Sequence, residues 1–215
     1  RERDALMQIL ASKARLKTLI KKEIQADAEK YGDARRSQLV DRVPAQALDE
    51  TALIPSEPVT IVLSTNGWVR VAKGHEIDPL EMTYKAGDGF AALARGRSNQ
   101  LAVFIDSAGK TYALPAHSLP SARGQGEPLS GRLKPADGSR FVGVMAGDPE
   151  QLFLLASDSG YGFVVKLGDM YTRNKAGKAT LSVPKGANVL APVAVRSLQD
   201  DWIVAASSEG YMLVI

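Results

Sequence analysis

Three short, glycine-centred stretches contain the residue types best suited to chemistry in this 215-residue sequence. They are residues 84–89 (YKAGDG), 121–126 (SARGQG) and 173–178 (RNKAGK). Matched on their central glycines, Gly87, Gly124 and Gly177, they are expected at one equivalent place in each of three structural repeats. Glycine lets a backbone approach a phosphate closely, and Arg or Lys supplies the opposite charge. The pattern fits a rim that contacts nucleic-acid phosphates, and it fits somewhat better a set of plain glycine-rich connections.

Positive charge is concentrated around the third of these stretches. Residues 166–185 contain five basic side chains and a single acidic one, Asp169. The chain as a whole has a formal net charge of only +3, so its composition alone does not indicate a polyanion partner. The position of the charge is therefore more informative than its total.

Other kinds of chemistry find little support in the sequence. There is no cysteine, which excludes thiolate metal sites and a cysteine nucleophile. His75 and His117 lack metal-ligand spacing, and Pro128 follows Gly124 and Gly126 too closely for a dinucleotide-binding loop. No nucleophile–base constellation is found, and no apolar run reaches the roughly 18 residues of a membrane span. We expect neither a catalytic nor a metal site in this chain.

The elements that must position the three stretches are β-hairpins. From residue 59 onward, four units repeat an apolar run, a polar turn and a second apolar run. The turn glycines are Gly67, Gly109, Gly160 and Gly210, and tight hairpin turns need their positive φ. A hairpin unit every 40–50 residues, roughly, is the period of propeller blades. Trp68 and Trp202 lie at strand positions, and core packing is the favoured role for both.

Before residue 59 the period is helical. Apolar residues recur every three or four positions through residues 1–31, with Leu16 to Ile24 as a stripe. An ordinary docking face on protein is favoured over a coiled-coil seam, because Lys13 and Asp27 interrupt the pattern. Ser12 predicts a break into two helices through N-capping, and Gly32 predicts the helix end.

Three segments follow from this change of period. They are a helical segment (1–36), a linker with two prolines (37–56) and a β domain (57–215). The chain has no initiator Met and stops within an apolar run, so we expect a piece of a longer protein, cut within its fourth blade.

Several segments together resemble the A subunits of bacterial type IIA topoisomerases. Residues 59–70 resemble the opening of the first blade of their C-terminal domain, and residues 31–37 resemble the segment that ends the last long helix of the breakage-reunion core. Residues 119–129 and 156–163 are most similar to the topoisomerase IV type from proteobacteria. The resemblance covers essentially the whole chain.

This resemblance implies a mainly β fold, a propeller-like β-pinwheel of four-stranded blades that exchange strands, preceded by a helical segment. In that family DNA lies on the basic outer rim. The A subunits of gyrase wrap DNA with a glutamine-arginine-arginine-glycine-glycine-lysine-glycine box. Residues 84–89 correspond to that box, with Tyr84 at an arginine position and Asp88 at the lysine position. The departure argues for the topoisomerase IV type.

The resemblance also implies a parent enzyme that unlinks daughter chromosomes and relaxes supercoils by ATP-dependent strand passage. It would use Mg²⁺, with ATP bound on a partner of the B type, in an A₂B₂ assembly in the cytoplasm, associated with the nucleoid and open to peripheral membrane association. This chain would bind duplex DNA but contain no cleaving tyrosine and bind no cofactor. The expected DNA-contacting residues are Arg70, Lys73, Lys85, Arg123, Arg132, Arg173, Lys175 and Lys178. The alternatives are a gyrase-type wrapping domain and a propeller that binds other proteins.

Overall fold

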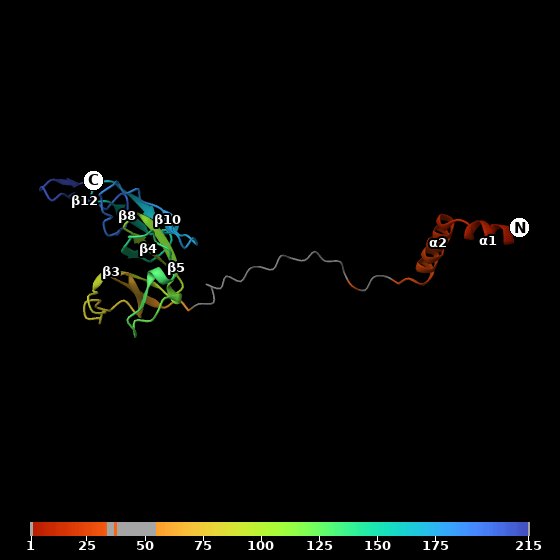
Figure 1. Ribbon diagram of the computed structural model, residues 1–215, viewed down its shortest axis with the longest axis horizontal. Helices are drawn as coiled ribbons and strands as arrows, with labels where there is room; N and C mark the ends of the chain where they lie inside the picture. Colours follow the sequence, from red (N-terminus) through yellow and green to blue (C-terminus); the bar gives the residue numbers. More distant parts are fainter. Residues whose placement is uncertain (1, 34–36, 38–54, 215) are drawn as a thin grey trace. The chain divides into compact units, whose positions relative to one another are not determined.

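A computed structural model describes residues 2–33, 37 and 55–214 of the chain. The chain divides into two compact units, Arg1–Ala47 and Leu48–Ile215 (Figure 1). Apart from residues 37, 55 and 56, the predicted linker lies outside the described residues.

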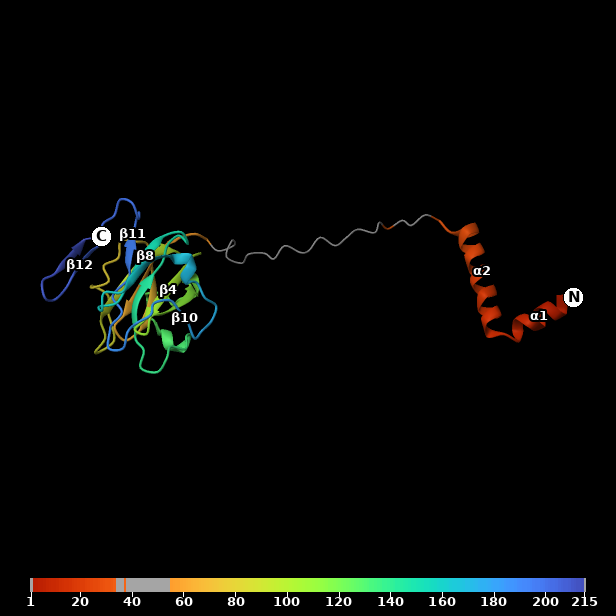
Figure 2. The ribbon, with the colours of Figure 1, turned by 90° about the horizontal axis from the view of Figure 1, so that it is seen from above.

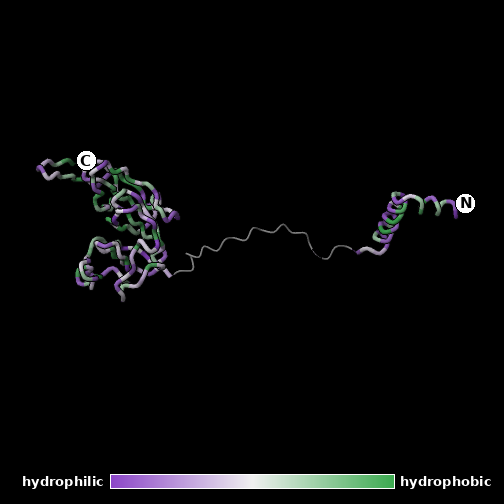
Figure 3. The backbone as a smooth tube through the Cα atoms, viewed as in Figure 1, coloured by the Kyte–Doolittle hydropathy of each residue, from purple (hydrophilic) through white to green (hydrophobic). Residues whose placement is uncertain are grey.

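The first unit consists of two helices, α1 (Glu2–Leu10) and α2 (Lys13–Tyr31). Ser12 separates them as predicted, because its hydroxyl accepts a hydrogen bond from the backbone N–H of Arg15 at 3.5 Å. Hydropathy alternates along α2, as an amphipathic helix requires (Figure 3). Within this unit Ile20 and Ile24 are exposed, so docking of the stripe on protein stays a prediction.

The helix α2 ends at Gly32 as expected, but for a different reason. Gly32 is extended, with φ −71°, rather than left-handed. Its N–H donates to the carbonyl of Ala28, and a Cβ at Gly32 would lie 2.2 Å from that oxygen. Close approach, rather than positive φ, therefore favours glycine here.

The second unit is built from short strands and 3₁₀ turns. The strands are β1 (Pro58–Ser64), β2 (Trp68–Lys73), β3 (Phe90–Arg97), β4 (Leu101–Asp106), β5 (Lys110–Pro115), β6 (Glu127–Pro128), β7 (Phe141–Met145), β8 (Leu152–Ala156), β9 (Gly162–Lys166), β10 (Lys178–Ala179), β11 (Val193–Val195), β12 (Val204–Ala206) and β13 (Met212–Val214). The 3₁₀ turns are η2 (Ala116–Ser118), η3 (Leu129–Gly131) and η4 (Leu167–Met170). The absence of any longer helix from residues 59–118 agrees with the hairpin prediction.

The sheets exchange strands. Their orders are β3-β1-β2-β6, then β10-β5-β4-β7, then β11-β8-β9, and finally β12-β13. Strand β6 follows the β4–β5 hairpin along the chain but pairs with β2 of the first sheet. Strand β10 likewise follows the β8–β9 hairpin but pairs with β5 of the second sheet. This exchange confirms the expected β-pinwheel, with the first two sheets four-stranded.

The four hairpin turns are equivalent, as the sequence predicted. Gly67, Gly109, Gly160 and Gly210 all have φ between 76° and 87°. A side chain at the end of the first strand also holds the turn: the carboxylate of Asp106 accepts from the backbone N–H of Lys110 at 2.9 Å. The hydroxyls of Ser64 and Ser207 do the same for Trp68 and Tyr211.

Two hydrophobic cores meet at strand β4. Side chains alternate between the two faces of a strand, so Ala102 and Phe104 enter one core while Val103 and Ile105 enter the other. The first core also contains Tyr112, whose ring packs edge-on against Phe141 with the centroids 5.5 Å apart. The middle sheet thus fixes the first and third sheets relative to one another.

The hairpin β12–β13 projects from the other sheets in both views (Figures 1 and 2). Trp202 is 75% exposed, so the core role predicted for it is wrong in the part of the chain that the structure describes. The prediction failed because core packing needs a facing sheet, and no described residue covers this hairpin.

Candidate nucleic-acid interface

Two of the three glycine-centred stretches occupy equivalent places. Residues 121–126 lead into β6 and residues 172–177 lead into β10, the two exchanged strands. Glu127 pairs with Val69, and Lys178 pairs with Thr111. Val69 and Thr111 lie at the same position after their turn glycines, Gly67 and Gly109. We call these stretches the 121–126 loop and the 172–177 loop.

The register between these loops differs from the one expected from sequence. Gly126, rather than Gly124, is the counterpart of Gly177, because each directly precedes its exchanged strand. Their φ values are 86° and 79°, whereas Gly124 does not have a positive φ. Sequence matching on the central glycine was therefore two residues out of register.

The remaining stretch, residues 84–89, belongs to another class of turn. It leads into β3 of its own sheet, not into an exchanged strand. The carbonyl of Gly89 accepts from the N–H of Thr65, as those of Arg140 and Asn188 accept from Ser107 and Asp158. Residues 84–89 thus match residues 135–140 and 183–188, and the expectation of three equivalent basic loops is wrong.

Exposed cations gather at the 172–177 loop. Arg173, Lys175 and Lys178 are all exposed, and Lys178 Nζ donates to the carbonyl of Asp169 at 2.5 Å. Lys134, which the sequence did not single out, comes next to them because its N–H donates to the carbonyl of Lys175 at 2.7 Å. Among the described residues, no carboxylate forms an ion pair with any of these four cations.

The 121–126 loop presents less charge to solvent. Arg123 is exposed and is the only cation within the loop. Arg132 is half-buried, forms an ion pair with Glu127 and donates to the hydroxyl of Ser118 at 3.0 Å. Arg132 therefore already has two partners within the protein.

Arg70 is buried beneath the 121–126 loop, with only 5% of its surface exposed. Its Nη1 donates to the carbonyl of Thr83 at 2.9 Å and to that of Gly124 at 3.5 Å. Its guanidinium also lies over the ring of Tyr84, 4.5 Å from the centroid. Buried in this way, Arg70 does not offer its charge at the surface.

Lys73 and Lys85 are each engaged by a neighbour. Lys73 forms an exposed ion pair with Glu57 at 3.1 Å. Lys85 Nζ lies 3.3 Å from the ring centroid of Trp68, a cation–π contact. Both side chains are thus held by the protein in this conformation.

Asp88 stabilises its turn. Its Oδ1 accepts from the hydroxyl of Thr65 at 2.8 Å and from the N–H of Asn66 at 2.9 Å. Desolvation raises the pKa of Asp88, but hydrogen bonds from Ser64, Thr65 and the N–H groups of Asn66 and Gly89 outweigh it and lower the pKa below its usual value. Asp88 therefore connects its own turn to the hairpin turn between β1 and β2, and it does not form part of a phosphate-binding site.

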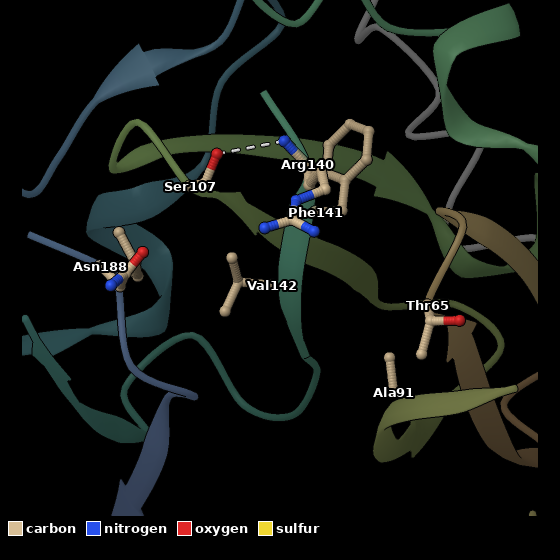
Figure 4. Close-up of a pocket in the computed structure, with 8 residues that line it drawn as sticks. Thr65, Ala91, Ser107, Arg140, Phe141, Val142 and Asn188 are labelled. Carbon is tan, nitrogen blue, oxygen red and sulfur yellow. Dashed lines mark hydrogen bonds between the residues drawn. The ribbon is translucent and has the colours of Figure 1, made fainter. Parts of the chain in front are cut away.

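A hollow of about 340 Å³ lies between the hairpin turns of the first two sheets and residues 188–189 of the segment before β11. Figure 4 shows Arg140 among Thr65, Ser107 and Asn188, with its N–H donating to the hydroxyl of Ser107 at 3.1 Å. Thr65, Arg140 and Phe141 also line a second hollow of about 250 Å³. Arg140 is exposed and has no carboxylate partner among the described residues.

The described residues contain no cluster of three or more His, Cys, Asp or Glu side chains arranged to hold a metal. None of the described helices combines the length and apolarity needed to cross a bilayer.

Several proteins similar in sequence share one name, the A subunit of DNA topoisomerase 4. The chain is 58% identical over 214 residues to the protein of that name from Pseudomonas aeruginosa, 50% identical to that from Escherichia coli K12, and 38% identical over 219 residues to that from Neisseria gonorrhoeae. The first two matches cover all of this chain, and the third covers 99% of it. The chain spans 28% of the length of each of these relatives. No family model matches it.

Solved structures with the same fold include the E. coli ParC C-terminal domain, with a TM-score of 0.68 and 49% identity over 74% of this chain and 65% of that one. A DNA topoisomerase IV C-terminal domain has a TM-score of 0.59 at 15% identity, covering 75% of this chain and 52% of that one. A DNA gyrase A C-terminal domain has a TM-score of 0.55 at 17% identity, covering 87% and 66%. The last two support the fold alone.

Proposed function

The chain belongs to the family of DNA topoisomerase 4 A subunits, and on that premise we propose that it binds duplex DNA through the loops that lead into its exchanged strands. The 172–177 loop would make the main contact and Arg123 of the 121–126 loop a lesser one. Lys85, with Asp88 beside it, would contribute least.

One observation carries this proposal: Arg173, Lys175, Lys178 and Lys134 are close in space without a carboxylate partner among the described residues. A cation already paired with an acid gains less from a phosphate, since it must first give up its partner. Phosphate contacts of this kind release counterions and do not depend on base sequence. The proposed binding is therefore electrostatic and tolerant of sequence.

In the whole protein, we propose that this region engages duplex DNA for ATP-dependent strand passage, which decatenates daughter chromosomes and relaxes supercoils. The partners would be the B subunit of topoisomerase IV, which binds ATP, and a second copy of the A type, with Mg²⁺ serving the cleavage chemistry elsewhere in the enzyme. Its place would be the cytoplasm, with the nucleoid. This chain alone would neither cleave DNA nor hydrolyse ATP. A covalent DNA adduct formed by the chain would contradict that statement.

The test is a salt titration of duplex binding by fluorescence anisotropy. Replacing Arg173, Lys175 and Lys178 with Ala should flatten the log–log salt slope by up to about 2.7 units, since each phosphate contact contributes about 0.9. A charge-matched control replaces Lys73, Lys85 and Lys166, which are held by Glu57, Trp68 and Glu150.

The control should flatten the slope by less than about one unit, since its cations already have partners. Equal slopes for the two triple variants would show that only total charge matters and would overturn the assignment to the 172–177 loop. If the parent chain itself shows no salt-dependent binding, the DNA proposal fails and a protein-binding propeller becomes the better hypothesis.

A further inference from the structure

The side chain beneath each exchanged-strand loop is the third residue after the turn glycine. In the second sheet this residue is Tyr112, and a Cβ added to Gly177 would lie 2.7 Å from its ring. In the first sheet it is Arg70, and a Cβ added to Gly126 would lie 3.3 Å from the Arg70 Cβ. Both side chains support the loop above them, one with a neutral ring and the other with a charge.

Burial of Arg70 is unusual for a residue of its type. A buried guanidinium is costly unless it is paired or well hydrogen-bonded, and Arg70 has no ion pair with a described carboxylate. Only Nη1 has hydrogen-bond partners, whereas Nη2 is buried with none among the described residues. Its stabilisation comes from two carbonyls and the face of Tyr84.

These contacts join segments that are distant in sequence. Thr83 and Tyr84 precede β3, whereas Gly124 belongs to the loop that follows the β4–β5 hairpin. Arg70 connects both to the middle of β2. Without it, the 121–126 loop would keep the bonds that Val71 makes to Pro120 and Ala122, and β6 after it, but among the described residues its tip would keep only the local hydrogen bonds to Ser121.

We infer that Arg70 is a positioning residue, a buried cation that holds the tip of the 121–126 loop against β2 and so fixes the place of Arg123. In the DNA complex it acts through Arg123 and does not itself touch a phosphate. The second statement rests on the proposed DNA binding, whereas the first does not.

The first experiment needs no DNA. Amide hydrogen exchange of residues 123–127 is followed in the 215-residue chain and in its Arg70→Met variant. Exchange there should become about tenfold faster, as expected when a charge-assisted bond to a local segment is lost, while the amides of β1 keep their rates. Arg97→Met on β3, an exposed arginine paired with Pro58 at the start of β1, serves as the control and should leave these amides unchanged.

A milder variant keeps the test decisive if Arg70→Met unfolds the domain. Arg70→Lys retains the charge but loses the planar group that both donates to the carbonyls and stacks on Tyr84. It should still accelerate exchange at residues 123–127 by about threefold. Exchange identical to the parent in the folded variant, or acceleration spread evenly over the sheet, would overturn the positioning role.

The second experiment separates acting through Arg123 from acting on DNA directly. Duplex affinity is measured for Arg70→Met, Arg123→Ala and the double variant. Arg70→Met should weaken binding about threefold to fivefold in the parent but less than about twofold when Arg123 is already Ala, since residues that act as a unit are not additive.

Additive losses would show that Arg70 contacts DNA independently and would refute its action through Arg123. If no variant and no parent chain binds DNA, the proposed function fails while the exchange result still decides the positioning role.

Discussion

The 121–126 and 172–177 loops have the same place in the fold but distribute their charge in opposite ways. The 172–177 loop exposes its cations and rests on the neutral Tyr112, whereas the 121–126 loop exposes only Arg123 and rests on the buried Arg70. The same topology thus accommodates exposed cations in one loop and a buried, structural cation beneath the other. Counting basic residues along the chain does not distinguish the two roles.

The largest expected difference between the loops lies in their glycines. Gly126→Ala should lower the free energy of unfolding by about 3 kcal/mol or more, through a left-handed φ and a Cβ that meets the main chain. That Cβ would lie 2.3 Å from the carbonyl oxygen of Val69, which cannot move without breaking the sheet.

Gly177→Ala should cost less, about 2 kcal/mol, because its Cβ mainly meets the side-chain ring of Tyr112 at 2.7 Å. Urea unfolding followed by circular dichroism measures both variants. Equal losses of unfolding free energy would mean that the two loops tolerate an added side chain equally well, and would contradict the expected difference between them.

Tyr112→Phe tests the neutral platform. The hydroxyl of Tyr112 donates to Asp106 Oδ2 at 2.8 Å, so its removal leaves a buried carboxylate oxygen without that donor and should cost about 1–2 kcal/mol at neutral pH. Burial, together with the hydrogen bond and charge of Asp106, raises the pKa of Tyr112 far above its usual value of 10.0.

A pKa raised in the folded state stabilises the protein fully below pH 10, and that contribution is lost as the pH rises further. The parent should therefore lose about 1.4 kcal/mol per pH unit above pH 10 relative to Tyr112→Phe. Urea unfolding of both proteins from about pH 8 to about pH 11.5 measures this difference. Parallel pH profiles would contradict it, since the other tyrosines are common to both.

The smallest expected difference lies within the 172–177 loop region itself. Arg173→Ala should flatten the salt slope of duplex binding by about 0.9 unit, as one full phosphate contact. Lys178→Ala should flatten it by less than about half of that, because Lys178 already donates to the carbonyl of Asp169. Anisotropy titrations of the two single variants compare them directly, and a larger effect for Lys178 would reverse this ranking.

Local chemistry made the hairpins predictable from sequence. The turn glycines need positive φ wherever the fold places them, and the Ser12 hydroxyl caps a helix through its own neighbours. Exchange of strands between sheets was not visible in the hairpin repeat, because β6 is two residues long and its partner β2 is distant in the chain. That feature came from the family resemblance.

The role of Arg70 could not be read from its strand. It stands between Val69 and Val71, so strand alternation assigns it to the face opposite the core, which is normally solvated. The 121–126 loop covers that face. Which side chain lies beneath the loop depends on the pairing register of β2 and β6, and a one-residue slip would change it. The two-residue error in matching Gly124 to Gly177 has the same origin, because the pairing of β6 and β10, rather than the local motif, selects the equivalent glycine.

The exchange of strands also sets the order in which strands can pair while the protein is being synthesised. Strand β2 ends at Lys73, but its partner β6 begins only at Glu127, so a ribosome adding ~5–20 residues per second leaves the edge of β2 open for several seconds. An open strand edge invites pairing with other nascent chains, and a charged side chain on it discourages such pairing. Arg70 is in the middle of that strand, so we expect its charge to discourage such pairing until β6 has been made.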